Sequence, residues 1–217
     1  MGANAIIPWN VMLKDITKEW IINHSVNVEA GYVNNKNDLG KETNCGITYA
    51  TAQEWKSQLV AKFGWDGMMI NLTREMAWYI YDHGWWQRMR CDELMAIHPL
   101  LCQRIFDFAI NGGRVVSVKY LQRLLNVLNR QGKDFPDYTA DGGIGPNTLS
   151  QLKAFAAKRG PRGIMYLLQG LTGMHVNHYV EISEKRVANE EFTNGWLDRL
   201  LGATEFYARV MIVGEGK

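Results

Sequence analysis

Three residues in one polar stretch have side chains that could together cleave a glycosidic bond. Glu29 lies just before Gly31, Asp38 follows nine positions later among turn-forming residues, and Thr43 comes five positions after Asp38. Hydrolysis needs a carboxylic acid to protonate the leaving oxygen, and a second group to position water or stabilise the oxocarbenium-like transition state. We therefore consider Glu29 as general acid, with Asp38 and Thr43 orienting or activating the water.

Spacing alone does not establish this chemistry. The chain has 22 acidic residues, so pairs nine positions apart are expected by chance. Surface carboxylates on a loop are the simpler interpretation of the spacing by itself. The hypothesis requires the chain to turn back, because inverting glycosidases hold their two carboxylates roughly 6.5–9.5 Å apart.

The elements around the acids must position them. Apolar residues recur at helical intervals from Trp9 to Val28, which predicts an amphipathic helix ending near Glu29. An acid at a helix end, against apolar neighbours, is disfavoured in its ionised form, so we expect a raised pKa for Glu29. Residues 31–47 have no helical period and contain turn formers, which predicts a small, irregular β-hairpin.

The rest of the chain is mostly helical in pattern. The apolar run at 99–111 predicts a buried, central helix. The loop at 130–147 ends in D-G-G-I-G-P, which predicts a tight turn with Ile144 beneath a helix start. Other predicted helices cover 51–62 (from a capping pattern at Thr51-x-x-Glu54), 71 or 73 to 84, 118–128, and most of 160–209, with interruptions near 170–173 and 194–195.

Composition fits an ordinary globular chain, with 47% hydrophobic and 21% charged residues among 217. A net charge of +2 gives no reason to expect a nucleic-acid partner. Three cysteines at irregular spacing give no disulfide framework and no zinc pattern, so we expect reduced thiols and a reducing cytoplasm. We see no secretory signal peptide and no run long enough for a membrane helix.

Other candidate residues have a structural alternative. Tyr49 could stack on a sugar or pack in the core, and Asn111, at the end of the apolar helix, could hydrogen-bond an N-acetyl group. The pair at 85–86, two tryptophans, could line a cleft but is expected in the core. His175 and His178 are spaced for one helix face, but the sequence shows no third ligand, so we expect no metal and no cofactor.

Several motifs resemble glycoside hydrolase family 108, a family of N-acetylmuramidases found mainly as phage endolysins. E-A-G-Y-V-N-N and E-T-N-C-G-I-T are similar to its hallmark E-G-G-Y-V-N…E-T-N-F-G-I-T. The likeness continues in residues 72–86 and 106–113, and residues 119–149 are similar to the peptidoglycan-binding segment that usually follows. Ala30 replaces the usual glycine and Cys45 an aromatic residue.

The resemblance implies a fold and a reaction. The family's catalytic glutamate corresponds to Glu29, and the Glu-x8-Asp-x4-Thr arrangement also resembles the set in phage lysozymes, although the spacing to Thr43 differs by one. The implied fold is α+β, mainly α and lysozyme-like, with a small β-hairpin next to the catalytic helix. We expect a catalytic region at 1–98 and a helical region at 99–217 that includes the peptidoglycan-binding segment, packed as one unit.

The implied activity is that of an endolysin: hydrolysis of the β-1,4 bond between N-acetylmuramic acid and N-acetylglucosamine in peptidoglycan strands. Such a protein would be a monomer without stable membrane insertion, held in the host cytoplasm until a separate holin lets it reach periplasmic peptidoglycan. A lytic transglycosylase on the same bond and a non-catalytic wall-binding or secretion-associated protein are the alternatives. A peptidase or amidase is less favoured, because no Cys/His pair or metal cluster is evident.

Overall fold

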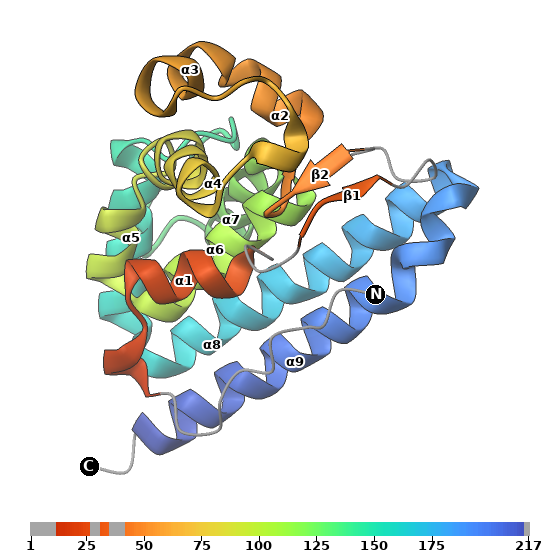
Figure 1. Cartoon of the computed structure of the whole chain (residues 1–217). Coiled ribbons are helices and arrows are strands. Elements are labelled where there is room, and N and C mark those ends of the chain that lie inside the picture. Colours follow the sequence, from red (N-terminus) through yellow and green to blue (C-terminus); the bar gives the residue numbers. More distant parts are fainter. Residues whose placement is uncertain (1–11, 27–30, 35–41, 215–217) are drawn as a thin grey trace.

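The computed structural model describes residues 12–26, 31–34 and 42–214 of the chain. Figure 1 shows a small sheet and short helices on one side of a central helix, with two long antiparallel helices along the other side. The described residues form a mainly helical fold, as predicted, with a small three-stranded antiparallel sheet where a hairpin was expected. In the described part, no helix is both long and apolar enough to cross a membrane.

The first helix is shorter than its apolar pattern predicts. A 3-10 turn, η1 (Leu13–Asp15), precedes α1 (Lys18–Ser25), and Thr17 caps α1 by accepting a hydrogen bond from the Trp20 amide. The helix ends at Ser25, because Val26 is extended (φ −121°, ψ 142°). The expectation of one helix to Glu29 is therefore wrong. Ile16 and Val26 extend the apolar pattern because both are buried in the core, although neither is helical.

The predicted hairpin is a three-stranded sheet. Strand β1 (Val33–Asn34) pairs with β2 (Glu42–Asn44), which pairs with β3 (Ile47–Thr48). Between β2 and β3 the two turn residues, Cys45 and Gly46, have φ of 50° and 75°. Positive φ at both positions of a two-residue turn matches the right-handed twist of the strands. This turn explains the third strand, which the sequence pattern did not predict.

Helices α2 to α5 lead from the sheet to the central helix: α2 contacts β3, and α5 packs against α6. Thr48, not Thr51, caps the first of them, by accepting from the Thr51 amide. Helix α4 begins after Thr73, as one predicted start has it, but ends at Tyr81 and continues as a π-turn through the expected stop at Gly84. The bounds are α2 Tyr49–Glu54, α3 Lys56–Phe63, η2 Met69–Asn71, α4 Arg74–Tyr81, η3 Asp82–Trp86 and α5 Cys91–Ile97.

The central helix is α6 (Pro99–Gly112), and every residue from Leu100 to Ala109 is buried. This confirms the prediction from its continuous apolar run. Helix α6 contacts α1, α5, α7 and α8, so it joins the two halves of the chain into one packed body. Trp86 is also fully buried, and its indole donates to Asp92 at 2.8 Å, while Trp85 is half-buried against the core.

The C-terminal half consists of α7 (Arg114–Leu128), the predicted loop, α8 (Pro146–Lys185), η4 (Val187–Asn189) and α9 (Glu190–Gly214). The predicted interruptions at 170–173 and 194–195 are wrong, since α8 and α9 continue through them. A Cβ at Gly170 would lie 2.9 Å from Leu124, so this glycine permits close packing of α8 on α7. The actual break in α8 is Gly160 (φ 56°), before Pro161.

Candidate active site

Two of the three predicted catalytic residues, Glu29 and Asp38, lie outside the described residues. Their neighbours along the chain are described: Val26 and Gly31 flank the connection with Glu29, and the paired residues Asn34 and Glu42 flank the one with Asp38. Thr43 lies half-buried in the middle of β2, opposite Val33 and Thr48. The sheet therefore sets Thr43 on the strand that leads out of the Asp38 connection.

Helix α1 ends earlier in the sequence than expected, before Glu29. Since α1 ends at Ser25, its carbonyl terminus is four residues before Glu29. The field of a helix terminus falls off within its last turn. The expected rise in the pKa of Glu29 stays a prediction, because Glu29 lies outside the described residues.

The buried side chain of Asn44 links the sheet to the turn before α4. The amide nitrogen of Asn44 donates to the carbonyl oxygens of Met69 at 2.7 Å and Leu72 at 3.2 Å. It also lies 3.3 Å from the carbonyl oxygen of Ile70. These bonds hold the turn before α4 against β2, next to Thr43.

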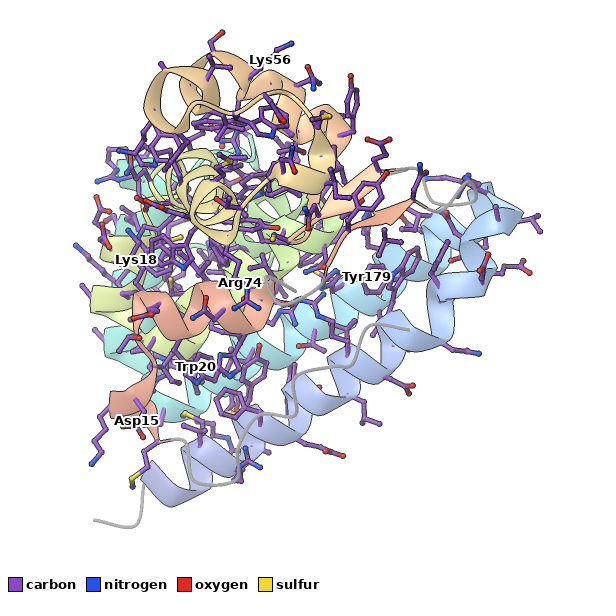
Figure 2. The ribbon with its side chains drawn as sticks, viewed as in Figure 1. Asp15, Lys18, Trp20, Lys56, Arg74 and Tyr179 are labelled. Carbon is purple, nitrogen blue, oxygen red and sulfur yellow. The ribbon has the colours of Figure 1, made fainter. Side chains whose placement is uncertain are left out.

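An open groove of about 440 Å³ lies along α1, α3, α4 and η3. Lys18 at the start of α1 pairs with Asp82 at 2.5 Å, which fixes α1 beside the end of α4. In Figure 2, Lys18 and Arg74 lie toward opposite ends of α1. The groove lining combines acids, cations and aromatic rings: Glu19, Lys62, Phe63, Arg74, Glu75, Trp78, Tyr79, Asp82 and His83.

The aromatic rings of the groove carry cations over their faces. The Lys62 ammonium lies 5.4 Å from the centre of the Tyr79 ring and 5.6 Å from that of Phe63. Lys18 lies 5.6 Å from the Trp78 ring. Such contacts attract a cation to the ring face. The groove therefore offers aromatic rings together with charged groups of both signs.

The predicted sugar-binding residues lie elsewhere. Tyr49 is 47% exposed at the first position of α2, directly after the sheet. Asn111 is exposed near the end of α6, and its side-chain nitrogen donates to the Asp107 carbonyl at 2.7 Å. Neither residue lines the groove that the described residues form. Their roles in binding stay predictions.

Sequence reasoning missed the groove residues. The stretch L-T-R-E-M-A-W-Y-I-Y-D-H-G-W-W contributes only to the family likeness. Glu75, Tyr79 and His83 recur every four residues there, as do Arg74, Trp78 and Asp82. Such spacing places residues along one side of a helix. The recurrence could have indicated a polar and aromatic helix side, but not which other helix it faces.

The histidine pair of α8 belongs to the interior. His175 is fully buried and stacks on Phe108, with ring centres 3.7 Å apart. Burial first, and then the charges of Arg104 and His178, lower the pKa of His175 to about 2, so its imidazole is neutral. No group of three His, Cys, Asp or Glu among the described residues could hold a metal ion.

Two family models match this chain. The model of glycosyl hydrolase 108 matches residues 22–113, which contain the end of α1, the sheet and helices α2 to α6. Residues 22–113 belong to the glycosyl hydrolase 108 family. A second model, described as a predicted peptidoglycan domain, matches residues 116–201. The chain is thus a glycoside hydrolase that acts on peptidoglycan, and the family resemblance of its motifs is confirmed.

The fold is shared with a solved structure. SagA of Brucella abortus has a TM-score of 0.64 and 24% sequence identity, over 90% of this chain and 97% of that chain. The lysozyme-like, mainly helical fold is thereby confirmed. No curated protein matches the chain. The two matched segments meet between residues 113 and 116, whereas the division expected at residue 98 stays a prediction.

Proposed function

We propose that this glycosyl hydrolase 108 chain hydrolyses the β-1,4 bond between N-acetylmuramic acid and N-acetylglucosamine, with Glu29 as general acid. The observation that carries the proposal is the family match over residues 22–113, which includes the E-A-G-Y motif that begins at Glu29. A carboxylic acid in this role gives its proton to the glycosidic oxygen as the bond to the anomeric carbon breaks.

Asp38, with Thr43, is proposed to orient or activate the water that attacks the anomeric carbon. The support is the position of Thr43 on β2, which leads directly out of the connection that contains Asp38. A carboxylate acting as base takes one proton from the water while the sugar takes its hydroxyl. The hydroxyl of Thr43 can hydrogen-bond the same water.

The groove is proposed to hold substrate beyond the bond that is cut. Its rings and its lysine suit a polymer of alternating amino sugars whose side branches carry carboxylates. Tyr49 and Asn111 remain proposed sugar contacts at the margin of the sheet and at the end of α6. No step of this mechanism calls for a cofactor or a metal.

The proposed biological role is that of an endolysin. It rests on the resemblance of the motifs to enzymes found mainly in phages. In this role the protein is a monomer that accumulates in the host cytoplasm, and a separate holin gives it access to peptidoglycan in the periplasm. A reporter test is direct: expression should lyse a host only when a holin is co-expressed, and expression of the Glu29→Gln variant should not.

The decisive experiment measures reducing ends and product masses from purified murein for the parent, Glu29→Gln and Asp38→Asn. We expect release by the parent and a loss of about 10²–10⁴-fold in kcat for Glu29→Gln. Parental activity in Glu29→Gln would reject the assignment of the acid. Products with 1,6-anhydro ends would show a lytic transglycosylase instead, and parental activity in Asp38→Asn would remove the second carboxylate from the mechanism.

A further inference from the structure

A line of polar contacts joins side chains of α6, α8 and α9 to the main chain at the end of α1. Nη2 of Arg104 on α6 lies 2.5 Å from Nδ1 of His175 on α8, and 2.9 Å from a carboxylate oxygen of Asp107. The other oxygen of Asp107 accepts from Nη2 of Arg199 on α9. The same nitrogen of Arg199 donates to the carbonyl oxygen of Ser25 at 3.3 Å.

The last contact ends at the point where α1 stops. Ser25 is the final residue of α1, and the last carbonyls of a helix have no partner within it. A guanidinium there satisfies an acceptor and opposes the negative end of the helix dipole. Arg199 therefore holds the main chain of α1 at its exit, directly before the connection to the sheet.

The negative charge of Asp107 balances the positive charges of Arg104 and Arg199. Arg104 is fully buried and Asp107 is 4% exposed. The carboxylate of Asp107 pairs with the guanidinium groups of both Arg104 and Arg199. Burial, with the like charge of Arg104, lowers the pKa of Arg199 to about 9. That value is above neutral pH, so Arg199 remains charged and paired with Asp107. Removal of the carboxylate would leave the buried Arg104 without its ion-pair partner, beside the partly exposed Arg199.

The partners come from both matched segments. Ser25 and Asp107 lie within the glycosyl hydrolase match at 22–113, while Arg199 lies within the peptidoglycan-domain match at 116–201. Helices α8 and α9 pack side by side, and α8 also contacts α6 (Figure 1). The second segment thus reaches into the first and contacts the chain that leads to the proposed acid.

We infer that Arg199 is a positioning residue of the hydrolase, which anchors the end of α1 through the Ser25 carbonyl while Asp107 holds its guanidinium. The second matched segment then has a role in catalysis in addition to wall binding. This inference rests on the proposed function, because Arg199 would act on Glu29, which follows Ser25 four positions later in the sequence. Arg199 touches no substrate.

Both contacts of Arg199 are made by Nη2, and the rigid, planar guanidinium holds the two N–H bonds of this nitrogen in fixed directions. A lysine ammonium is instead a compact point charge on a flexible stem, so it does not fix both directions at once. Arg199→Lys thus keeps the charge near Asp107 but loosens the hold on Ser25. An exposed arginine in the same matched segment, Arg162 on α8, contacts Tyr166 and provides the matched control, Arg162→Lys.

The experiment compares the parent, Arg199→Lys, Asp107→Asn, Arg162→Lys and Glu29→Gln. Reducing-end release from purified murein gives kcat and KM at a temperature where circular dichroism shows every assayed variant to be folded. We expect Arg199→Lys to lower kcat about 10- to 100-fold with KM within twofold of the parent, because misplacement of a reacting group costs rate more than binding. Arg162→Lys should match the parent in both constants.

Each outcome decides the matter. Parental kcat in Arg199→Lys, or a change in KM alone, overturns the inference while an inactive Glu29→Gln leaves the proposed function standing. Activity in Glu29→Gln overturns both. Asp107→Asn should lower kcat at least as far as Arg199→Lys, and a folded Asp107→Asn with parental kcat would overturn the inference by itself.

Discussion

The side-chain nitrogen of Asn44 lies 2.7 Å from the carbonyl oxygen of Met69, and this bond joins the sheet to the turn before α4. The amide of Asn44 is buried and also reaches the carbonyl of Leu72. Asn44 thus helps to hold β2, which carries Thr43, against the chain that leads into α4, the helix that lines the groove. Both parts of the proposed site depend on this contact.

We predict that Asn44→Ala destabilises the protein by about 1–3 kcal/mol, because buried carbonyl groups lose their donor. The unfolding temperature should fall by roughly 2–4 °C for each kcal/mol in a chain of this size. Urea unfolding at neutral pH measures the change. Asn177→Ala, which removes an exposed asparagine bonded to Glu181, is the control and should change little. Equal stability of the two variants would contradict the anchoring role.

A charge reversal tests the groove. Lys62→Glu places a carboxylate beside Tyr79 and should raise KM for murein roughly 2- to 5-fold, because one exposed charge contributes only modestly. The value of kcat should stay unchanged. Lys56→Glu makes the same change on the same helix, outside the groove lining (Figure 2). The difference should shrink at high salt, and an equal effect of both variants would reject binding in the groove.

The glycine motif before α8 has a structural role that two serine variants can separate. Gly142 has φ of 84°, and a Cβ there would lie 2.7 Å from Cγ1 of Val115 and 2.9 Å from its carbonyl oxygen. We expect Gly142→Ser to cost about 2 kcal/mol or more in unfolding free energy, from strain and overpacking. Gly145 caps α8 in an extended conformation with open space around it. Gly145→Ser should be neutral or stabilising.

Acid should weaken the fold through its buried histidine. Burial lowers the pKa of His175 to about 2, below the 6.5 of an exposed histidine. Between these values the unfolded chain binds a proton that the folded chain does not, so stability falls as the pH falls below 6.5. The slope is at most about 1.4 kcal/mol per pH unit for one histidine. His98, lowered to about 4 by burial, acts in the same direction.

Urea unfolding from pH 7 to pH 4.5 measures this slope. His175→Gln keeps an acceptor for Arg104 but has no titrating group, so its slope should be smaller by about one proton's contribution. The variant should also be less stable at every pH, because the ring stacked on Phe108 is lost. An unchanged slope would show that His175 does not remain neutral in the folded protein.

The sequence predicts the elements whose signals are local. Helix α6 follows from an apolar run, α7 from its heptad-like leucines, and the start of α8 from Pro146 after a glycine turn. These patterns depend on hydrogen bonds and burial within a few residues of each other. The hallmark motif can also be recognised without a structure, because a family match compares only the order of residues. The assignment of Glu29 as the proposed acid therefore comes from residue order alone.

Only tertiary structure decides where a local pattern stops. The apolar pattern runs to Val28, but α1 ends at Ser25, and Ile16 and Val26 are buried without being helical. Glycines at 170 and 195 do not break helices, since packing against α7 and along α8 outweighs a propensity cost of about 1 kcal/mol. Apolar residues are buried whether or not their backbone is helical, so a short stretch of sequence does not show where the helix ends.

The groove and the line from His175 to Ser25 belong entirely to the fold. Arg199 and Ser25 are 174 positions apart, and Lys18 and Asp82 are 64 apart. In the sequence, the charged members of these pairs (Arg199, Lys18 and Asp82) look like ordinary surface charges. The sequence by itself determined the helical class, the family and the proposed acid, because these depend on residue order and local periodicity. The tertiary structure decided which charges share one carboxylate and which helix sides form a groove, because low-dielectric burial makes distant charges pair only once the chain has packed.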